Sequence, residues 1–106
     1  MESLSQAERD VLAERRRQID VEGWTPKHDD AHKPDELAQA AVCYAMPPAL
    51  RELQSDDTPV LWPWHPRWWK KGGRRRNLVK AAALIIAEIE RLDRVYIEKK
   101  EPPCSA

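Results

Sequence analysis

A run of 28 residues without glycine or proline, residues 74–101, constrains the fold of this chain more than any other feature. Its apolar residues recur at spacings of three and four, which is typical of an amphipathic helix. They are Leu78, Ala81, Ala82, Ile85, Ile89, Leu92 and Tyr96, and Leu84 and Ile86 widen the stripe. We therefore predict a helix from Arg74 to about Glu98 as the central element of the fold.

Two shorter helices are predicted before it. Ser5-Gln6-Ala7-Glu8 matches the capping box, so a first helix should begin there, continue to about Glu22 and stop at Gly23. A second helix should begin near Pro34-Asp35-Glu36 and end by Met46, because Pro47-Pro48 cannot continue it. Its many small residues would allow another helix to approach closely.

The segments between these helices contain prolines and no apolar period, so we expect structured loops. Residues 23–34 should form one loop, anchored by Trp24. Residues 49–54 should add a helical turn before the polar loop 55–59, and Pro66 should open another turn that carries Trp68 and Trp69. The expected fold is a small all-α domain over residues 1–98, with two Trp- and Pro-containing loops and a flexible C-terminal tail over residues 99–106.

Length and composition exclude several classes of protein. A chain of 106 residues can build one modest core, which excludes a multi-domain enzyme. It contains no apolar run long enough to span a membrane, and its first residues lack the order of a signal peptide, so we expect a soluble, cytoplasmic protein. The two cysteines, Cys43 and Cys104, lack CxxC spacing, so we expect a buried free thiol and a free thiol in the tail.

The charges balance at 18 basic and 18 acidic residues, but they are separated along the chain. Residues 20–57 carry three bases and nine acids, whereas residues 58–87 carry seven bases and no acid. A ligand meets a local patch rather than the average charge. We therefore look for the function where the two blocks meet.

Four of the five tryptophans fall within residues 62–69, and the basic block continues directly after them. Indole faces can stack on a base, and Arg or Lys can hold phosphates, so this combination favours a nucleotide-like ligand. The alternative is structural, because a domain without Phe needs tryptophans in its core. The candidate ligand-binding residues are Trp24, Asp29, Asp30, Trp62, Trp64, Trp68, Trp69, Lys70, Arg74, Arg75 and Arg76.

Two other groups are candidates for metal binding, although capping, turn formation and ordinary helix ion pairs explain the same residues. The first group is His28 and His32, within the proline-flanked loop, and Glu36 just after it. The second is Glu90 and Asp93, which form an ExxD spacing on the long helix, with Glu88 nearby. Imidazole and carboxylate groups both bind divalent metals, so a metal-dependent nucleotide phosphohydrolase remains an alternative. We expect no resident cofactor.

Several segments resemble a group of small proteins encoded by tailed phages and prophages. The likeness covers about residues 11–94, in the order EGWTP from Glu22, HDD from His28, EL at Glu36, WPW from Trp62, WWK from Trp68 and LIIAEIERLDR from Leu84. The group implies no particular activity. Phage proteins of this size that bind nucleotides often sequester host immune signals, so the resemblance implies a counter-defence role.

A second resemblance, to the RyR domain named for the ryanodine receptor repeats, covers about residues 13–37. The matching residues are Arg16, Arg17, Gly23, Trp24, Thr25, Asp29, Asp30, Pro34 and Leu37, while Pro26 departs from the pattern. It implies a small helical recognition module with an adenine-nucleotide-type pocket near Trp24. Our interpretation is a protein that binds an anionic, nucleotide-like molecule without turnover. The alternatives are that the Trp-rich segment binds and inhibits a host protein, or that the chain forms a homo-oligomer.

Overall fold

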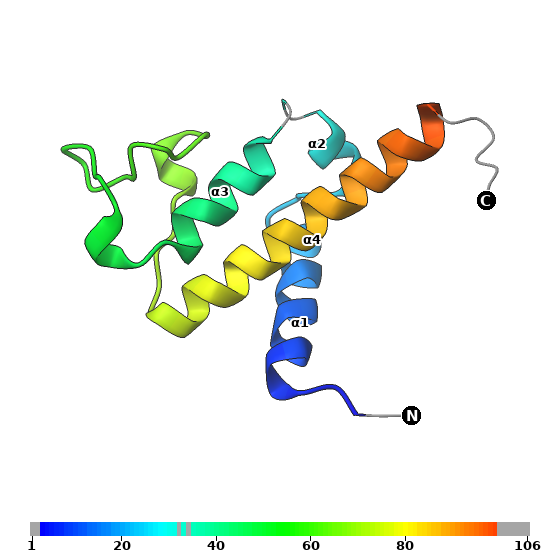
Figure 1. The fold of residues 1–106 in the computed structure, drawn as a ribbon, viewed down its shortest axis with the longest axis horizontal. Helices are drawn as coiled ribbons and strands as arrows, with labels where there is room; N and C mark the ends of the chain where they lie inside the picture. Colours follow the sequence, from blue (N-terminus) through cyan, green and yellow to red (C-terminus); the bar gives the residue numbers. More distant parts are fainter. Residues whose placement is uncertain (1–2, 32, 34, 100–106) are drawn as a thin grey trace.

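The computed structural model describes residues 3–31, 33 and 35–99, with the side chains of Asp29, Asp30, Glu98 and Lys99 excepted. This part of the chain is helical and forms no strand, only an isolated bridge between Leu53 and Pro59. The helices are α1 (Gln6–Asp20), α2 (Pro26–Asp30), α3 (Glu36–Ala45) and α4 (Arg74–Lys99), with 3₁₀ turns at Pro48–Leu50 and Pro66–Trp68. α4 packs against α1, α2 and α3 (Figure 1), which confirms the predicted all-α fold.

The first helix begins as predicted. The Ser5 hydroxyl accepts a hydrogen bond from the Glu8 amide at 3.0 Å, and the Glu8 carboxylate accepts one from the Ser5 amide, which completes the capping box. α1 ends at Asp20, two residues before the predicted end. Gly23 then adopts a φ of 78°, which lets the Trp24 amide donate to the Gln18 carbonyl at 2.9 Å.

The structure differs from the prediction after Gly23. Residues 26–30 form α2 rather than a loop, and the Thr25 hydroxyl accepts from the His28 amide at 3.2 Å. Pro26 is favourable in the first turn because the backbone N–H that proline lacks would have no intrahelical partner there. α3 begins at Glu36, and Asp35, at φ 71°, makes no side-chain cap. The tail expected over residues 99–106 lies, apart from Lys99, outside the described residues.

The hydrophobic core lies between α3 and α4. α3 buries Leu37, Ala40, Ala41, Cys43 and Tyr44, and α4 adds Ala81, Leu84 and Ala87. The small residues let the two helix backbones approach closely. Cys43 is a buried free thiol, as predicted, and burial raises its pKa to about 11. Cys104 is not among the described residues.

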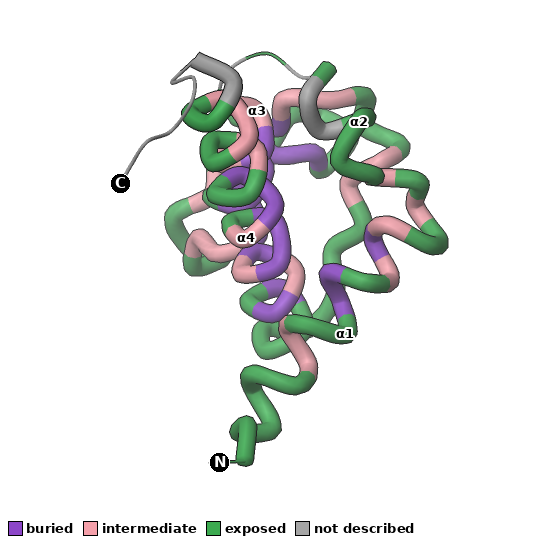
Figure 2. The backbone as a smooth tube through the Cα atoms, turned by 90° about the vertical axis from the view of Figure 1, so that its right-hand side faces the viewer, coloured by how far each residue is buried: buried purple, intermediate pink, exposed green. Residues whose placement is uncertain are grey.

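Most of the apolar stripe predicted on α4 faces away from this core, although Ala81 and Leu84 belong to it. On α4, Leu78, Ile85, Ile89, Leu92 and Tyr96 are 43–59% exposed. On α1, Leu12 is 49% exposed whereas Glu14 and Gln18 are 2% and 1% exposed. Figure 2 shows the buried segments where α4 runs beside α1 and α3, with the N-terminal half of α1 mostly exposed. α1 therefore turns its polar side inward, because α4 and the Trp-rich segment offer charged partners there.

Candidate functional site

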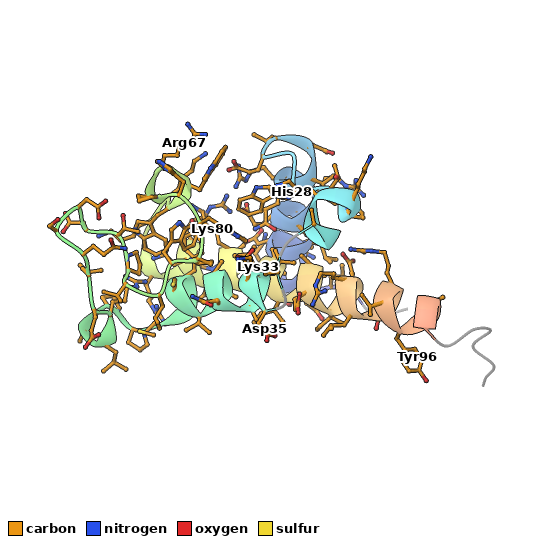
Figure 3. All side chains as sticks on the ribbon, turned by 90° about the horizontal axis from the view of Figure 1, so that it is seen from above. His28, Lys33, Asp35, Arg67, Lys80 and Tyr96 are labelled. Carbon is orange, nitrogen blue, oxygen red and sulfur yellow. The ribbon has the colours of Figure 1, made fainter. Side chains whose placement is uncertain are left out.

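A cleft of about 380 Å³ opens between the end of α1, α2 and the Trp-rich segment, and it is the candidate site. Its walls are Glu22, Trp24, His28, Trp64, His65 and Trp68. Figure 3 shows His28 on α2 and Arg67 in the Trp-rich segment on the same side of α4, with Lys80 on that side but closer to α4. The cleft therefore joins segments that are about 40 residues apart in the sequence.

A continuous aromatic cluster forms one wall of the cleft and connects it to the core. The ring centroids of Trp24 and Trp64 are 5.5 Å apart, and those of Trp64 and Trp62 are 5.3 Å apart. Trp62 also contacts Trp69 and Tyr44 edge-on, at 5.2 and 5.6 Å. Tilted and edge-on pairs are the preferred arrangements of aromatic rings. The cluster thus holds the cleft tryptophans in fixed orientations.

Below the cleft lies a smaller polar hollow, with Glu22, Trp24 and Trp68 in both. The other residues that line it are Glu14, Arg17, Gln18, Tyr44, Lys70 and Lys80. Gln18 is 1% exposed, and its side-chain oxygen has no hydrogen-bond partner among the described residues. A buried acceptor without a donor is costly, so in native proteins such an atom calls for a partner such as an ordered water.

Two buried carboxylates organise the charges around the hollow. Glu14 accepts hydrogen bonds from Arg17, Arg76 and Gln18, and Glu22 accepts from Arg17 and Lys70. Burial disfavours the charge of Glu14, but its bonds to Arg17 and Arg76 outweigh that effect and hold its pKa below the ordinary value.

The hollow carries more positive than negative charge. Lys80 is half-buried beside it and donates to the Lys70 carbonyl, with its ammonium 5.4 Å from the centre of the Tyr44 ring. Burial, and then the charge of Arg76, lower the pKa of Lys80. Burial also raises the pKa of Tyr44 to about 12, so the phenol is neutral at pH 7. Three bases that line the hollow, Arg17, Lys70 and Lys80, outnumber its two acids, Glu14 and Glu22, and the local field favours an anion.

Two cations lie over Trp68 at the rim of the cleft. The Arg67 guanidinium carbon is 5.3 Å from the ring centre, and the Lys70 ammonium is 5.6 Å from it. Nearby, Nδ1 of His65 accepts from the Arg67 amide at 3.1 Å, so a neutral His65 carries its proton on Nε2. The rim therefore presents proton donors next to an aromatic face.

The sequence-predicted ligand residues fall into three places. Trp24, Trp64 and Trp68 line the cleft and Lys70 lines the hollow. Trp62, which is 6% exposed, and Trp69 pack into the core with Tyr44. The Trp-rich segment is therefore folded inward. The side chains of Asp29 and Asp30 lie outside the described part of the structure.

The structure does not bring the arginine run to the cleft. Arg74 donates to the Ala45 and Met46 carbonyls at the end of α3, and Arg75 donates to Asp10 at 2.8 Å. The hydrogen bond of Arg76 to Glu14 is at the far side of the polar network. These residues fix α4 against α1 and α3. A phosphate group in the cleft would therefore have to be bound by residues other than these three arginines.

The candidate metal residues are not gathered into a site among the described residues, where no group of three or more His, Cys, Asp or Glu side chains could hold an ion. Glu90 pairs with Arg15 at 3.0 Å, and Glu88 pairs with Arg91 at 2.8 Å. Glu36 accepts from the Lys33 amide and the Trp64 indole. Asp93 is exposed on α4, and His32 is not described.

Sequence reasoning missed the polar network under the cleft. Glu14, Arg17, Gln18 and Tyr44 were not singled out as ligand-binding residues, and Lys80 was grouped with the basic run. A spacing of four between Glu14 and Gln18 is the only signal, and solvent-facing helix surfaces show the same spacing.

The comparisons with known proteins identify no relative. Scans of protein-family models, curated proteins and solved structures return no match for this chain. The two resemblances described above therefore stay predictions. Within the described residues, no helix is long and apolar enough to cross a membrane.

Proposed function

We propose that this chain is a small binding protein that takes up a planar, anionic, nucleotide-like ligand in the cleft of Trp24, Trp64 and Trp68, without turnover. The observation that carries the proposal is the position of this aromatic cleft directly over a buried hollow with excess positive charge. The cleft has a volume of about 380 Å³, which is in the range of small-molecule sites.

The aromatic walls support stacking of a planar group. The Trp24 and Trp64 rings are tilted by 57° to each other, so they form a corner rather than a parallel slot. A flat ring can lie against one indole face and present its edge to the other. Stacking on one aromatic side chain contributes about 1–3 kcal/mol per base.

The charges at the rim favour an anion over a cation. Aromatic cages for ammonium groups also use several tryptophans, but there an added cation would meet Arg67 and Lys70 over Trp68. Among the side chains that the structure describes, the cleft is lined by one carboxylate, Glu22, which already accepts from both Arg17 and Lys70. The hollow itself has a volume of about 10 Å³, near the minimum for one water molecule, so the unpartnered Gln18 oxygen can accept from a water there while the ligand occupies the cleft.

A titration of tryptophan fluorescence tests this function. The panel comprises AMP, ATP and cyclic dinucleotides, with adenosine, inorganic phosphate and choline as partial probes. Since both stacking and charge contribute, the nucleotides should give saturable changes at lower concentration than adenosine or phosphate. No saturable change with any nucleotide up to about 1 mM, in protein whose circular dichroism shows it folded, would contradict the proposal. Tighter binding of choline would instead indicate a cation site.

Neighbouring lysines provide a matched pair of variants. Both lysines are exposed, but Lys70 bonds to Glu22 and lines the hollow, whereas Lys71 lines neither the hollow nor the cleft. Lys70→Gln should weaken nucleotide binding about tenfold, which corresponds to about 1.4 kcal/mol, and leave adenosine binding nearly unchanged. Lys71→Gln should bind like the parent protein. Equal losses in both variants would mean that only the general positive charge matters.

Incubation with ATP also distinguishes binding from hydrolysis. Incubation of ATP with the protein and magnesium or manganese should return the nucleotide intact, as judged by chromatography. Release of phosphate or pyrophosphate at a rate that rises with protein concentration would favour the phosphohydrolase alternative.

A further inference from the structure

We propose that two copies of this chain pair through the exposed apolar stripe of α4, in an antiparallel arrangement. The stripe consists of Leu78, Ala82, Ile85, Ile89, Leu92 and Tyr96. Tyr96 points away from the side of α4 that carries His28 and Arg67 (Figure 3). Pairing through this face would leave the aromatic cleft open in both copies.

The spacing of the stripe is that of a coiled-coil seam. Its members are separated by four, three, four, three and four residues, which places them alternately at a and d positions over three heptads. The interior-facing residues of α4, such as Leu84 and Ala87, follow a different line along the helix. α4 therefore has one apolar face for its own core and a second that the core does not use.

The area of the stripe is sufficient for a dimer. Leu78, Ile85, Ile89 and Leu92 are 43–53% exposed and Tyr96 is 59% exposed. The stripe presents on the order of 500 Å² of apolar surface, which is near the upper limit for the largest patch of a monomer. Two copies would bury about 1,000 Å² in total, where specific interfaces begin. We therefore expect a dimer of micromolar rather than nanomolar affinity.

The positions of the side chains favour the antiparallel orientation. Symmetry about residue 87 would place Leu78 opposite Tyr96, Ala82 opposite Leu92, and Ile85 opposite Ile89 of the second copy. Each a position then meets a d position, and a small residue faces a large one. Parallel pairing would instead place each residue opposite its own copy, so that Ala82 would face Ala82 and leave the seam loosely packed.

Sedimentation over a concentration series tests the pairing. The parent protein should change from one chain to two between about 1 µM and 1 mM. Ile85→Lys would bury an unpaired charge in the seam and should weaken the association at least a hundredfold. Val42→Lys, at an equally exposed position on α3, is the matched control and should associate like the parent. Circular dichroism establishes that each variant is folded.

Single cysteines test the orientation. On a Cys104→Ser background, a mixture of the Leu78→Cys and Tyr96→Cys variants should form a mixed disulfide dimer, while neither variant should cross-link with itself. A parent protein that stays monomeric at about 1 mM, or a dimer that Ile85→Lys leaves intact, would overturn the pairing. Self-cross-linking of Leu78→Cys would overturn the antiparallel arrangement.

Discussion

Glu14 is the residue whose replacement tests most sharply how α1 is held against the rest of the fold. Its side chain is fully buried and accepts two hydrogen bonds from Arg17 at 2.9 Å, one from Arg76 and one from Gln18. Glu14→Gln keeps the size of the side chain but removes its charge, so Arg76 loses the carboxylate that compensates it and Arg17 keeps only Glu22.

The size of the effect follows from the exposure of the partners. Breaking a fully buried ion pair costs about 3–5 kcal/mol, because a charge is left without compensation. Here the side chains of Arg17 and Arg76 are 34% and 45% exposed, so water can partly solvate them. We therefore expect a loss of about 2 kcal/mol in the free energy of unfolding, and a fall of about 10 °C in Tm for a domain of this length.

Urea denaturation followed by circular dichroism measures this loss. Glu52→Gln, at an exposed position, is the control and should change the free energy of unfolding by less than about 0.5 kcal/mol. If Glu14→Gln were as mild as its control, the buried network would not hold α1 in place, and the polar hollow would lose its structural basis.

Three further predictions concern the same regions. The folded-state pKa of Glu14 lies below its ordinary value of 4.5, so the stabilisation by its carboxylate is complete above pH 4.5 and is lost as pH falls through the folded-state pKa. The difference in the free energy of unfolding between the parent and Glu14→Gln should therefore shrink in acid. A constant difference from pH 7 to 3 would contradict this. Gly23→Ala should cost about 1 kcal/mol in urea denaturation, since the φ of 78° is unfavourable for a residue with a Cβ although no atom lies within 4 Å of it; an unchanged midpoint would refute the backbone argument. In a Cys104→Ser background, Cys43 should react with a thiol reagent at pH 8 only in denaturant, because it is 1% exposed and its pKa is raised to about 11; fast reaction of the native protein would contradict its burial.

The helices that the sequence predicted well are those with local signals. The capping box at Ser5 and the proline pair after Met46 each act within a few residues, so their effect can be read without knowing the fold. α2 has only five residues, which is too short for an apolar period to appear. For this reason residues 26–30 were predicted as loop.

Which face of a helix is buried could not be read from periodicity. The spacing of Leu78, Ile85 and Leu92 identifies a face of α4, but whether the chain itself covers that face depends on where the other helices pack. The buried positions of α1, Glu14 and Gln18, carry the residue types of a solvated surface. Their roles depend on partners such as Arg76, 62 residues away, which no local pattern connects to them.

The roles of the five tryptophans show the same limit. The sequence left open which of these tryptophans fill the core and which face a ligand. Only the packing of Trp62 and Trp69 against Tyr44 separates them from the three rings of the cleft. The arginine run was grouped with the tryptophans because it follows them in sequence, yet α4 directs it toward α1 and the end of α3.

The indole N–H signals in a ¹⁵N–¹H correlation spectrum provide the most direct test of the proposed site. The five signals can be assigned from single Trp→Phe variants and then followed during titration with AMP and ATP. The signals of Trp24, Trp64 and Trp68 should shift saturably, while those of Trp62, in the core, and Trp69, packed against it outside the cleft, should stay nearly unchanged. Saturable shifts confined to Trp62 and Trp69, or no saturable shift of any indole, would contradict binding in this cleft.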